Sequence, residues 1–146
     1  NEFVMRAVTE RNLVVYGDQF WRPYIHTYDA ARAVLEVLES SSEKVANRVF
    51  NVGNTNENFR KCDLVAMIRK RVPALRVETV EKAEDPRDYR VSFERIRAEL
   101  GFTTTQTVES GISDIATAVE LNFFGMTADQ RYYNTPVQPV LTGALA

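Results

Sequence analysis

Short segments with the character of strands alternate along this chain with longer segments whose apolar residues recur with a helical period of about 3.6 residues. The expected strands are "NLVVYGD" (12–18), "PYIHTY" (23–28), "NRVFNVG" (47–53) and "LRVETVEK" (75–82). The expected helices occupy 1–10, 29–38, 59–72, 92–100 and 108–123. Helices that alternate with strands are typical of α/β proteins. The sequence therefore predicts an α/β fold.

Two of the expected helices carry apolar faces that indicate how they pack. In the helix at 29–38, Val34, Leu35 and Leu38 belong to a broad face suited to lying on a sheet. The last helix carries one continuous apolar stripe, formed by Val108, Ile112, Ile115, Val119 and Phe123. The stripe continues over about four turns and predicts an amphipathic helix.

The expected strand at 47–53 indicates that the chain is part of a longer one. An apolar strand of this kind usually pairs with neighbours in a parallel sheet whose two faces are both covered. Four short strands offer it few partners. In addition, Met5 lies inside the first helical segment, so a natural start there would divide that helix. We therefore expect further sequence before Asn1.

Charge and composition exclude several classes of partner. The chain has 18 basic and 20 acidic side chains and a formal net charge of −2, so no global field attracts nucleic acid or an anionic membrane. Its apolar runs are far shorter than the roughly 20 residues that span a bilayer. Cys62 is the only cysteine and His26 the only histidine, which excludes an internal disulfide and disfavours a metal site. We expect a cytoplasmic protein.

Five sequence elements in order carry a resemblance to a known family. They are "LVVYG" (13–17), "RPYIHTYDAARA" (22–33), "FNVG" (50–53), Arg87 and "RIRAELGF" (95–102). Together they resemble the C-terminal half of extended short-chain dehydrogenase/reductases, in the NAD-dependent nucleotide-sugar epimerase/dehydratase family. The resemblance covers about residues 1–124.

The resemblance implies a fold and a division of the chain. It implies the last strands and helices of a Rossmann-type parallel sheet, joined to a small α/β substrate-binding lobe. Residues 1–124 are then the substrate-binding part, and 125–146 an extended C-terminal arm. The family's G-x-G-x-x-G fingerprint and Tyr-x-x-x-Lys pair do not occur in the 146 residues. Hence NAD or NADP is expected to bind to a missing N-terminal half, and this chain alone is expected to be inactive.

The resemblance also assigns substrate-binding residues. Arg22 and Arg87 match the two family positions that contact the substrate diphosphate, for which a guanidinium offers a flat fork of charged donors. Val14 and Tyr16 correspond to a strand that lines the nucleobase pocket in relatives. Trp21 could stack on the base or the sugar. The alternatives are a solvated surface position for each arginine and plain packing for the other three residues.

Other polar residues near these positions have structural explanations. His26 shares one face of the expected strand at 23–28 with Tyr24 and Tyr28, and a structural hydrogen bond suits it better than a role as catalytic base. Asp85 and Asp88 flank Arg87 and either orient its guanidinium or are charges on an exposed loop. No residue of this chain is assigned a catalytic role.

Two functions remain open at this stage. The first is the substrate-binding portion of an NAD(P)-dependent nucleoside-diphosphate-sugar epimerase or dehydratase, with a homodimer expected by analogy to relatives. The second is a non-catalytic module that binds a nucleotide or assembles with a partner subunit. The sequence does not identify the sugar, the base, the choice of NAD or NADP, or the reaction.

Overall fold

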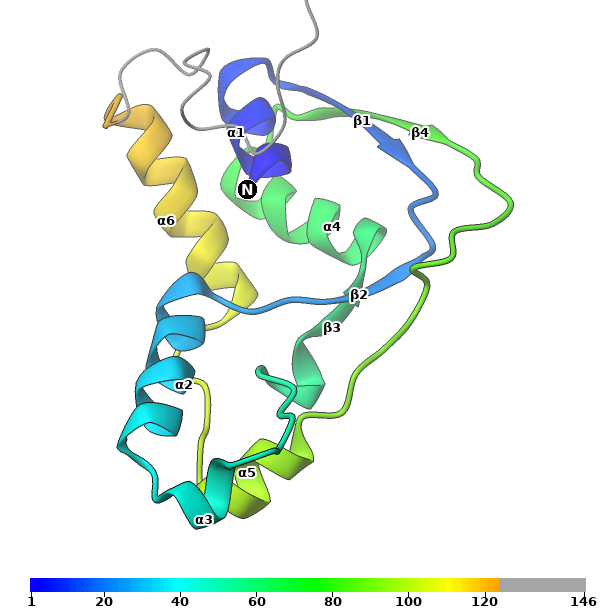
Figure 1. Ribbon diagram of the computed structural model, residues 1–146. Coiled ribbons are helices and arrows are strands. Elements are labelled where there is room, and N and C mark those ends of the chain that lie inside the picture. The colour runs from blue at the N-terminus through cyan, green and yellow to red at the C-terminus, as the bar shows by residue number, and fades with distance from the viewer. Residues whose placement is uncertain (124–146) are drawn as a thin grey trace, which may run out of the picture.

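The structure is a computed structural model that describes residues 1–123 (Figure 1). In chain order its elements are α1 (Glu2–Thr9), β1 (Asn12–Tyr16), β2 (Trp21–Pro23), α2 (Thr27–Glu39), α3 (Ser42–Val45), the 3-10 turn η1 (Thr55–Glu57), β3 (Asn58–Arg60), α4 (Lys61–Arg71), β4 (Arg76–Val80), α5 (Glu94–Leu100) and α6 (Val108–Glu120). Helices and short strands are interleaved, as the sequence predicts.

Two pairs of strands form the sheets of the described residues. β1 pairs with β4 in parallel, and this register sets Leu13 opposite Val77. β2 pairs with β3 in antiparallel orientation, with Arg22 opposite Phe59. Because the parallel pair is joined through helices, the structure confirms the α/β class.

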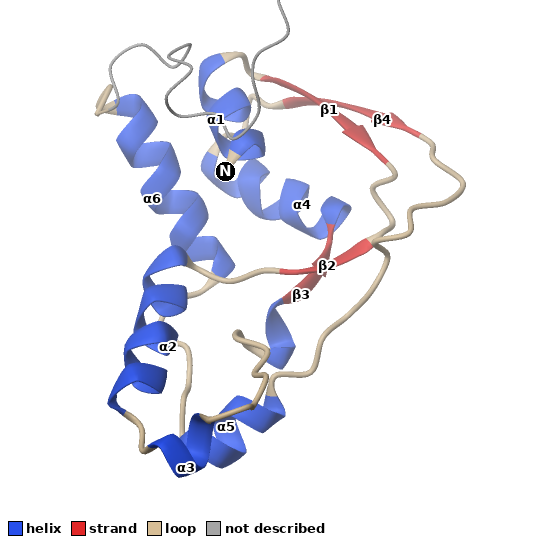
Figure 2. Ribbon diagram, viewed as in Figure 1, coloured by secondary structure: helices blue, strands red, loops and turns tan. Residues whose placement is uncertain are grey.

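Helices α1, α4 and α6 pack together beside the parallel strands (Figure 2). Their shared core consists of Val4, Ala7, Leu13, Val15, Val65, Ile68, Val72, Leu75, Ile112 and Ala116. Full burial of one such aliphatic side chain contributes about 1.5 to 3 kcal/mol relative to its exposure. Of the apolar stripe predicted for the last helix, Ile112 is buried in this core, and Val108 and Ile115 pack against it. Phe123 lies beyond the end of α6 and is 79% exposed.

A second, smaller cluster joins α2 to α5 and the residues that follow α5. Its buried members are Ala33, Phe93, Ile96 and Phe102. Between α5 and Phe102, Gly101 adopts a left-handed conformation with φ of 72° and ends the helix. A glycine reaches this conformation without the steric cost that a Cβ atom imposes.

The expected strand at 23–28 is wrong in its position. β2 ends at Pro23 and α2 begins at Thr27. His26 is the N-cap of α2, because its Nδ1 accepts a hydrogen bond from the backbone N–H of Tyr28 at 3.1 Å. A side-chain acceptor at this place satisfies one of the unpaired donors of the helix start. The alternation of Tyr24, His26 and Tyr28 therefore reflects a helix start and not a strand face.

The expected strand at 47–53 is also absent from the described residues. Neither strand pair of the described residues includes residues 47–53. Phe50 and Val52 pack on the second cluster instead. The apolar face of α2, which was expected to lie on a sheet, is not covered by one among residues 1–123. Its residues Val34, Leu35 and Leu38 are 61%, 52% and 76% exposed.

The helix expected at 59–72 is shorter than predicted. It begins at Lys61, because the residues just before it pair with β2 as strand β3. The Asp63 carboxylate accepts hydrogen bonds from the backbone N–H of Arg60 at 2.9 Å and from its guanidinium, and this closes the first turn of α4. The apolar period predicted the helix correctly, but the pairing of β3 with β2 moves its start from residue 59 to Lys61.

Two further expectations concern the chain ends and membranes. The arm predicted for 125–146 lies outside the described residues. Within residues 1–123, no helix has the length and apolar character needed to cross a membrane.

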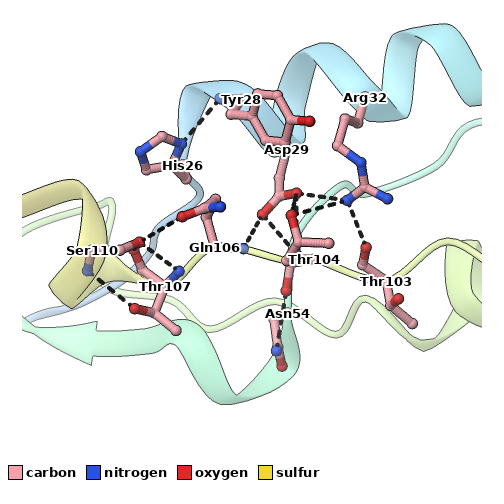
Figure 3. A network of polar contacts seen from close by, with 11 residues as sticks. His26, Tyr28, Asp29, Arg32, Asn54, Thr103, Thr104, Gln106, Thr107 and Ser110 are labelled. Carbon is pink, nitrogen blue, oxygen red and sulfur yellow. Dashed lines mark hydrogen bonds and ion pairs between the residues drawn. The ribbon is translucent and has the colours of Figure 1, made fainter. Parts of the chain in front are cut away.

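Asp29, in the first turn of α2, is completely buried and fully hydrogen-bonded (Figure 3). Its carboxylate accepts the backbone N–H of Thr105 at 3.0 Å, the backbone N–H of Gln106 at 2.8 Å, and Nη1 of Arg32 at 2.8 Å. Burial alone raises the pKa of Asp29, but these hydrogen bonds outweigh it and lower the pKa below its ordinary value of 3.8. The carboxylate therefore ties α2 to the segment that leads into α6.

The substitution Asp29→Asn tests this connection. We expect it to lower the free energy of unfolding by about 2 to 3 kcal/mol, because hydrogen bonds to a charged acceptor are lost in a buried place. Since folding lowers the pKa of Asp29, its stabilisation is complete well above pH 3.8 and is lost as pH falls through the folded-state value. The difference between wild type and variant, measured by urea unfolding, should thus shrink on acidification.

Glu39→Gln is the matched control, since Glu39 is an exposed carboxylate at the other end of α2. It should change the free energy of unfolding by less than about 0.5 kcal/mol. Equal effects of the two substitutions would contradict the account of Asp29.

Candidate anion-binding cleft

A cleft of about 660 Å³ is lined by α1, by the segment that joins β2 to α2, and by α4 and α6. Its apolar lining consists mainly of Phe3, Val4, Leu64, Ile68, Ile112 and Ile115. Three cationic side chains, Arg22, Lys61 and Arg87, also line it. The structure therefore brings together two predicted site residues that lie 65 positions apart in the sequence.

Arg22 is held in place from several directions. β2 carries it opposite Phe59, and its side chain is only 15% exposed. Its Nη1 donates to the carbonyl oxygen of Trp21 at 2.6 Å and also to the carbonyl oxygen of Arg87. Its Nη2 donates to Oδ2 of Asp85 at 2.7 Å. A guanidinium with this many partners has little rotational freedom.

Arg87 belongs to the loop between β4 and α5 and is more open. Its side chain is 71% exposed, and its Nε lies 3.2 Å from Oδ1 of Asp85. The backbone N–H of Arg87 donates to the same oxygen at 3.0 Å. One edge of the guanidinium thus faces a carboxylate, while most of the group is accessible to a ligand.

Asp85 connects the two arginines. Its side chain is 1% exposed, and its two oxygens are used separately, Oδ2 by Arg22 and Oδ1 by Arg87. The hydrogen bond from the backbone N–H of Arg87 lowers the pKa of Asp85 most, and burial opposes it. With the side-chain hydrogen bond from Arg87 and the charges of both guanidinium groups, the pKa falls from 3.8 to about 2. Asp85 is therefore ionised at neutral pH. Of the two interpretations of this residue, the buried geometry favours orientation of the arginines over a free charge on a loop.

Lys61 is a cleft residue that the sequence analysis missed. It is the first residue of α4, and its Nζ donates to the carbonyl oxygen of Tyr16 at 2.6 Å. Burial, and then the positive charge of Arg22, lower the pKa of Lys61. No local sequence signal marks Lys61, because it approaches Arg22 only through the pairing of β3 with β2.

The opposite wall contains the His26 ring. Its Nε2 lies 3.4 Å from Oδ2 of Asp114 on α6. Gly111 of the same helix faces the ring so closely that a Cβ there would lie 3.0 Å from the His26 Cδ2 atom. Nearby, burial raises the pKa of the Tyr24 hydroxyl. The structural role expected for His26 is confirmed by its capping bond, and it also contributes to the cleft surface.

The other three predicted site residues do not line the cleft. In β1, Leu13 and Val15 point into the core, so Val14 and Tyr16 point to the opposite face, and Tyr16 is 59% exposed. Trp21 lies close to two other guanidinium groups, with its ring centroid 5.6 Å from Cζ of Arg60 and 5.0 Å from Cζ of Arg90. These distances suit cation–π contacts.

The described residues form no cluster of metal ligands. Among residues 1–123, no group of three or more His, Cys, Asp or Glu side chains is placed to hold a metal ion. The cleft instead offers guanidinium and ammonium donors next to an apolar surface, which suits an anion attached to a less polar group.

Solved structures define the class to which this fold belongs. UDP-glucuronic acid 4-epimerase from Bacillus cereus matches with a TM-score of 0.69 and 15% identity, over 82% of this chain and 38% of that one. L-threonine dehydrogenase from Phytophthora infestans matches with a TM-score of 0.70 and 14% identity, over 83% of this chain and 40% of that one. At such identities the likeness shows the fold alone, a Rossmann-type α/β fold of which this chain matches about 40%.

The sequence comparisons point to one family. Residues 1–53 match the model described as "NAD dependent epimerase/dehydratase family". The dTDP-glucose 4,6-dehydratases of Escherichia coli and Salmonella typhimurium are each 31% identical over 120 residues, which covers 75% of this chain and 32% of theirs. The chain is therefore similar to the NAD-dependent epimerase/dehydratase family over residues 1–53, and to these dehydratases over 120 residues. It spans about a third of the length of the curated relatives that it matches.

The contrast between the two arginines can be tested through stability. Arg22→Ala should lower the free energy of unfolding by about 1 to 3 kcal/mol, because the buried carboxylate of Asp85 loses a charged donor. Arg87→Ala should change it by less than about 0.5 kcal/mol, since that side chain is mostly exposed. Chemical unfolding of both variants checks this difference, and equal costs would contradict the geometry described.

Proposed function

We propose that this chain is the substrate-binding portion of an NAD(P)-dependent nucleoside-diphosphate-sugar epimerase or dehydratase. The observation that carries the proposal is the pairing of Arg22 and Arg87, held on one buried carboxylate at a cleft with an apolar wall. In this proposal the two guanidinium groups bind the diphosphate. Lys61 adds a third positive charge near Arg22.

The chemistry of the cleft supports this substrate class. A diphosphate carries about two negative charges, and charge-assisted hydrogen bonds from arginine are worth about 1.5 to 3 kcal/mol each. By their names, the similar dTDP-glucose dehydratases and the UDP-glucuronic acid epimerase act on sugars that carry a nucleoside diphosphate. The threonine dehydrogenases with the same fold do not, so the fold alone does not select the substrate.

In the proposed division of labour, the catalytic and cofactor-binding residues belong to another part of the enzyme. The 146 residues contain neither the glycine fingerprint for the cofactor pyrophosphate nor a Tyr-x-x-x-Lys pair. A nicotinamide cofactor, NAD or NADP, supplies hydride transfer when bound. The role of residues 1–124 is then to bind and orient the nucleotide sugar. We assign no catalytic residue to them.

Val14, Tyr16 and Trp21 remain predictions as substrate contacts. Because they lie outside the cleft lining, a base or sugar could reach Trp21 only by extending past β2. A cytoplasmic location, a homodimer and the extended arm at 125–146 likewise remain predictions.

A non-catalytic binding or assembly module is the second candidate, and one observation favours it. α2 presents Val34, Leu35 and Leu38 to solvent, which is an apolar surface available to another polypeptide. The same exposure also fits a substrate-binding portion that packs on the rest of a longer enzyme. Binding of a nucleoside diphosphate without turnover in any longer form would favour the module.

Calorimetry with dTDP and UDP tests the proposed site. Arg87→Ala should weaken binding of whichever nucleotide binds by about tenfold or more, because at least one charge-assisted hydrogen bond is lost. Arg22→Ala should do the same wherever the variant remains folded.

Arg48→Ala is the control for loss of an exposed arginine. Arg48 pairs with Glu99 near α5 and does not line the cleft. It should leave the affinity unchanged. An unchanged affinity in Arg87→Ala as well would count against the site.

The division of labour predicts that the purified 146-residue chain lacks turnover. Incubated with NAD or NADP and with UDP-glucose or dTDP-glucose, it should neither reduce the cofactor nor convert the sugar, because its sequence contains neither the Tyr-x-x-x-Lys pair nor the glycine fingerprint. Absorbance at 340 nm and product analysis by chromatography provide the readout. Epimerisation or dehydration by this chain alone would overturn the assignment.

A further inference from the structure

We propose that Asp85 is a positioning residue that fixes the guanidinium groups of Arg22 and Arg87 in the arrangement that binds the diphosphate. The inference rests on the proposed function and adds to it. Asp85 does not line the cleft itself, so it positions the arginines without contacting the ligand.

The carboxylate of Asp85 contacts both arginines directly. Its Oδ2 receives Nη2 of Arg22 at 2.7 Å, and its Oδ1 receives both Nε of Arg87 at 3.2 Å and the backbone N–H of Arg87 at 3.0 Å. Lys82 is a more distant neighbour, with its Nζ 3.9 Å from Oδ2. With a side chain that is 1% exposed, Asp85 is satisfied by protein groups and is closed to solvent.

This arrangement orders two flexible side chains before the ligand arrives. Arg22 and Arg87 come from distant parts of the sequence, and the loop that carries Arg87 has no regular secondary structure. A free arginine side chain loses rotamer freedom when it binds an anion, which weakens binding. If Asp85 already restricts both side chains, part of that loss occurs during folding instead.

Positioning and simple electrostatics predict opposite effects for removal of the charge. Asp85 is a negative charge next to an anion site, so on electrostatic grounds its neutralisation should tighten the binding of a diphosphate. If Asp85 acts mainly by positioning, its neutralisation should weaken binding, although the site becomes more positive. The sign of the change therefore distinguishes the two explanations.

The test measures the affinity of wild type and Asp85→Asn for inorganic pyrophosphate, dTDP and UDP by calorimetry. We expect Asp85→Asn to bind at least about fivefold more weakly than wild type. Glu84→Gln is the matched control, since it removes an exposed carboxylate of the same loop that neither lines the cleft nor contacts either arginine. Its affinity should be equal to that of wild type or tighter.

Each outcome decides a specific claim. An affinity of Asp85→Asn that is unchanged or tighter, while wild type binds, overturns the role of Asp85 and leaves the proposed function standing. Absence of nucleotide and pyrophosphate binding by wild type overturns the proposed function and this inference with it.

A spectroscopic measurement covers the case in which Asp85→Asn does not fold. In wild type without ligand, the side-chain N–H resonances of Arg22 and Arg87 should show slower exchange with water and more restricted motion than those of Arg69, an exposed arginine of α4 whose side chain makes no hydrogen bond or ion pair with another described residue. In a folded Asp85→Asn variant this restriction should disappear. Equal mobility of all three arginines in wild type would contradict the proposal without any variant.

Discussion

The buried carboxylate of Asp29 is the interaction on which the two walls of the cleft depend. It lies in the first turn of α2, three residues after the His26 cap, and it draws in the backbone of Thr105 and Gln106. Thr107 follows at once and caps α6 by accepting the Ser110 N–H at 3.1 Å. Because a charge buried in this way is stable only when its hydrogen bonds are complete, the start of α2 and the start of α6 are fixed relative to each other.

Two buried carboxylates therefore organise the cleft. Asp29 fixes the helices that form its wall, and Asp85 holds the arginines that form its cationic end. Asp29 joins backbone groups and so determines where helices begin, whereas Asp85 joins two guanidinium groups and so determines where positive charge is presented. Both carboxyl groups have a pKa below the ordinary value, because folding surrounds each with donors. In this chain, acidic residues organise a site that we propose binds an anion.

Local patterns in the sequence predicted the elements that local physics determines. The α/β class, the end of α5 at Gly101 and the packed face of α6 follow from period and backbone preference. Sequence reasoning failed where a tertiary contact decides the outcome: the His26 cap replaced an apparent strand, and the pairing of β3 with β2 brought Lys61 to the cleft. Arg22 and Arg87 were found through a family motif, but the burial of Asp85 between them was not readable from a charged loop.

The most direct test of the central claim is a crystal structure of the protein with a bound nucleoside diphosphate or nucleotide sugar. The account predicts phosphate oxygens within hydrogen-bond distance of both the Arg22 and the Arg87 guanidinium groups, with the rest of the ligand against the apolar wall of the cleft. A ligand bound elsewhere, with the two arginines still directed only at Asp85 and the backbone, would contradict it.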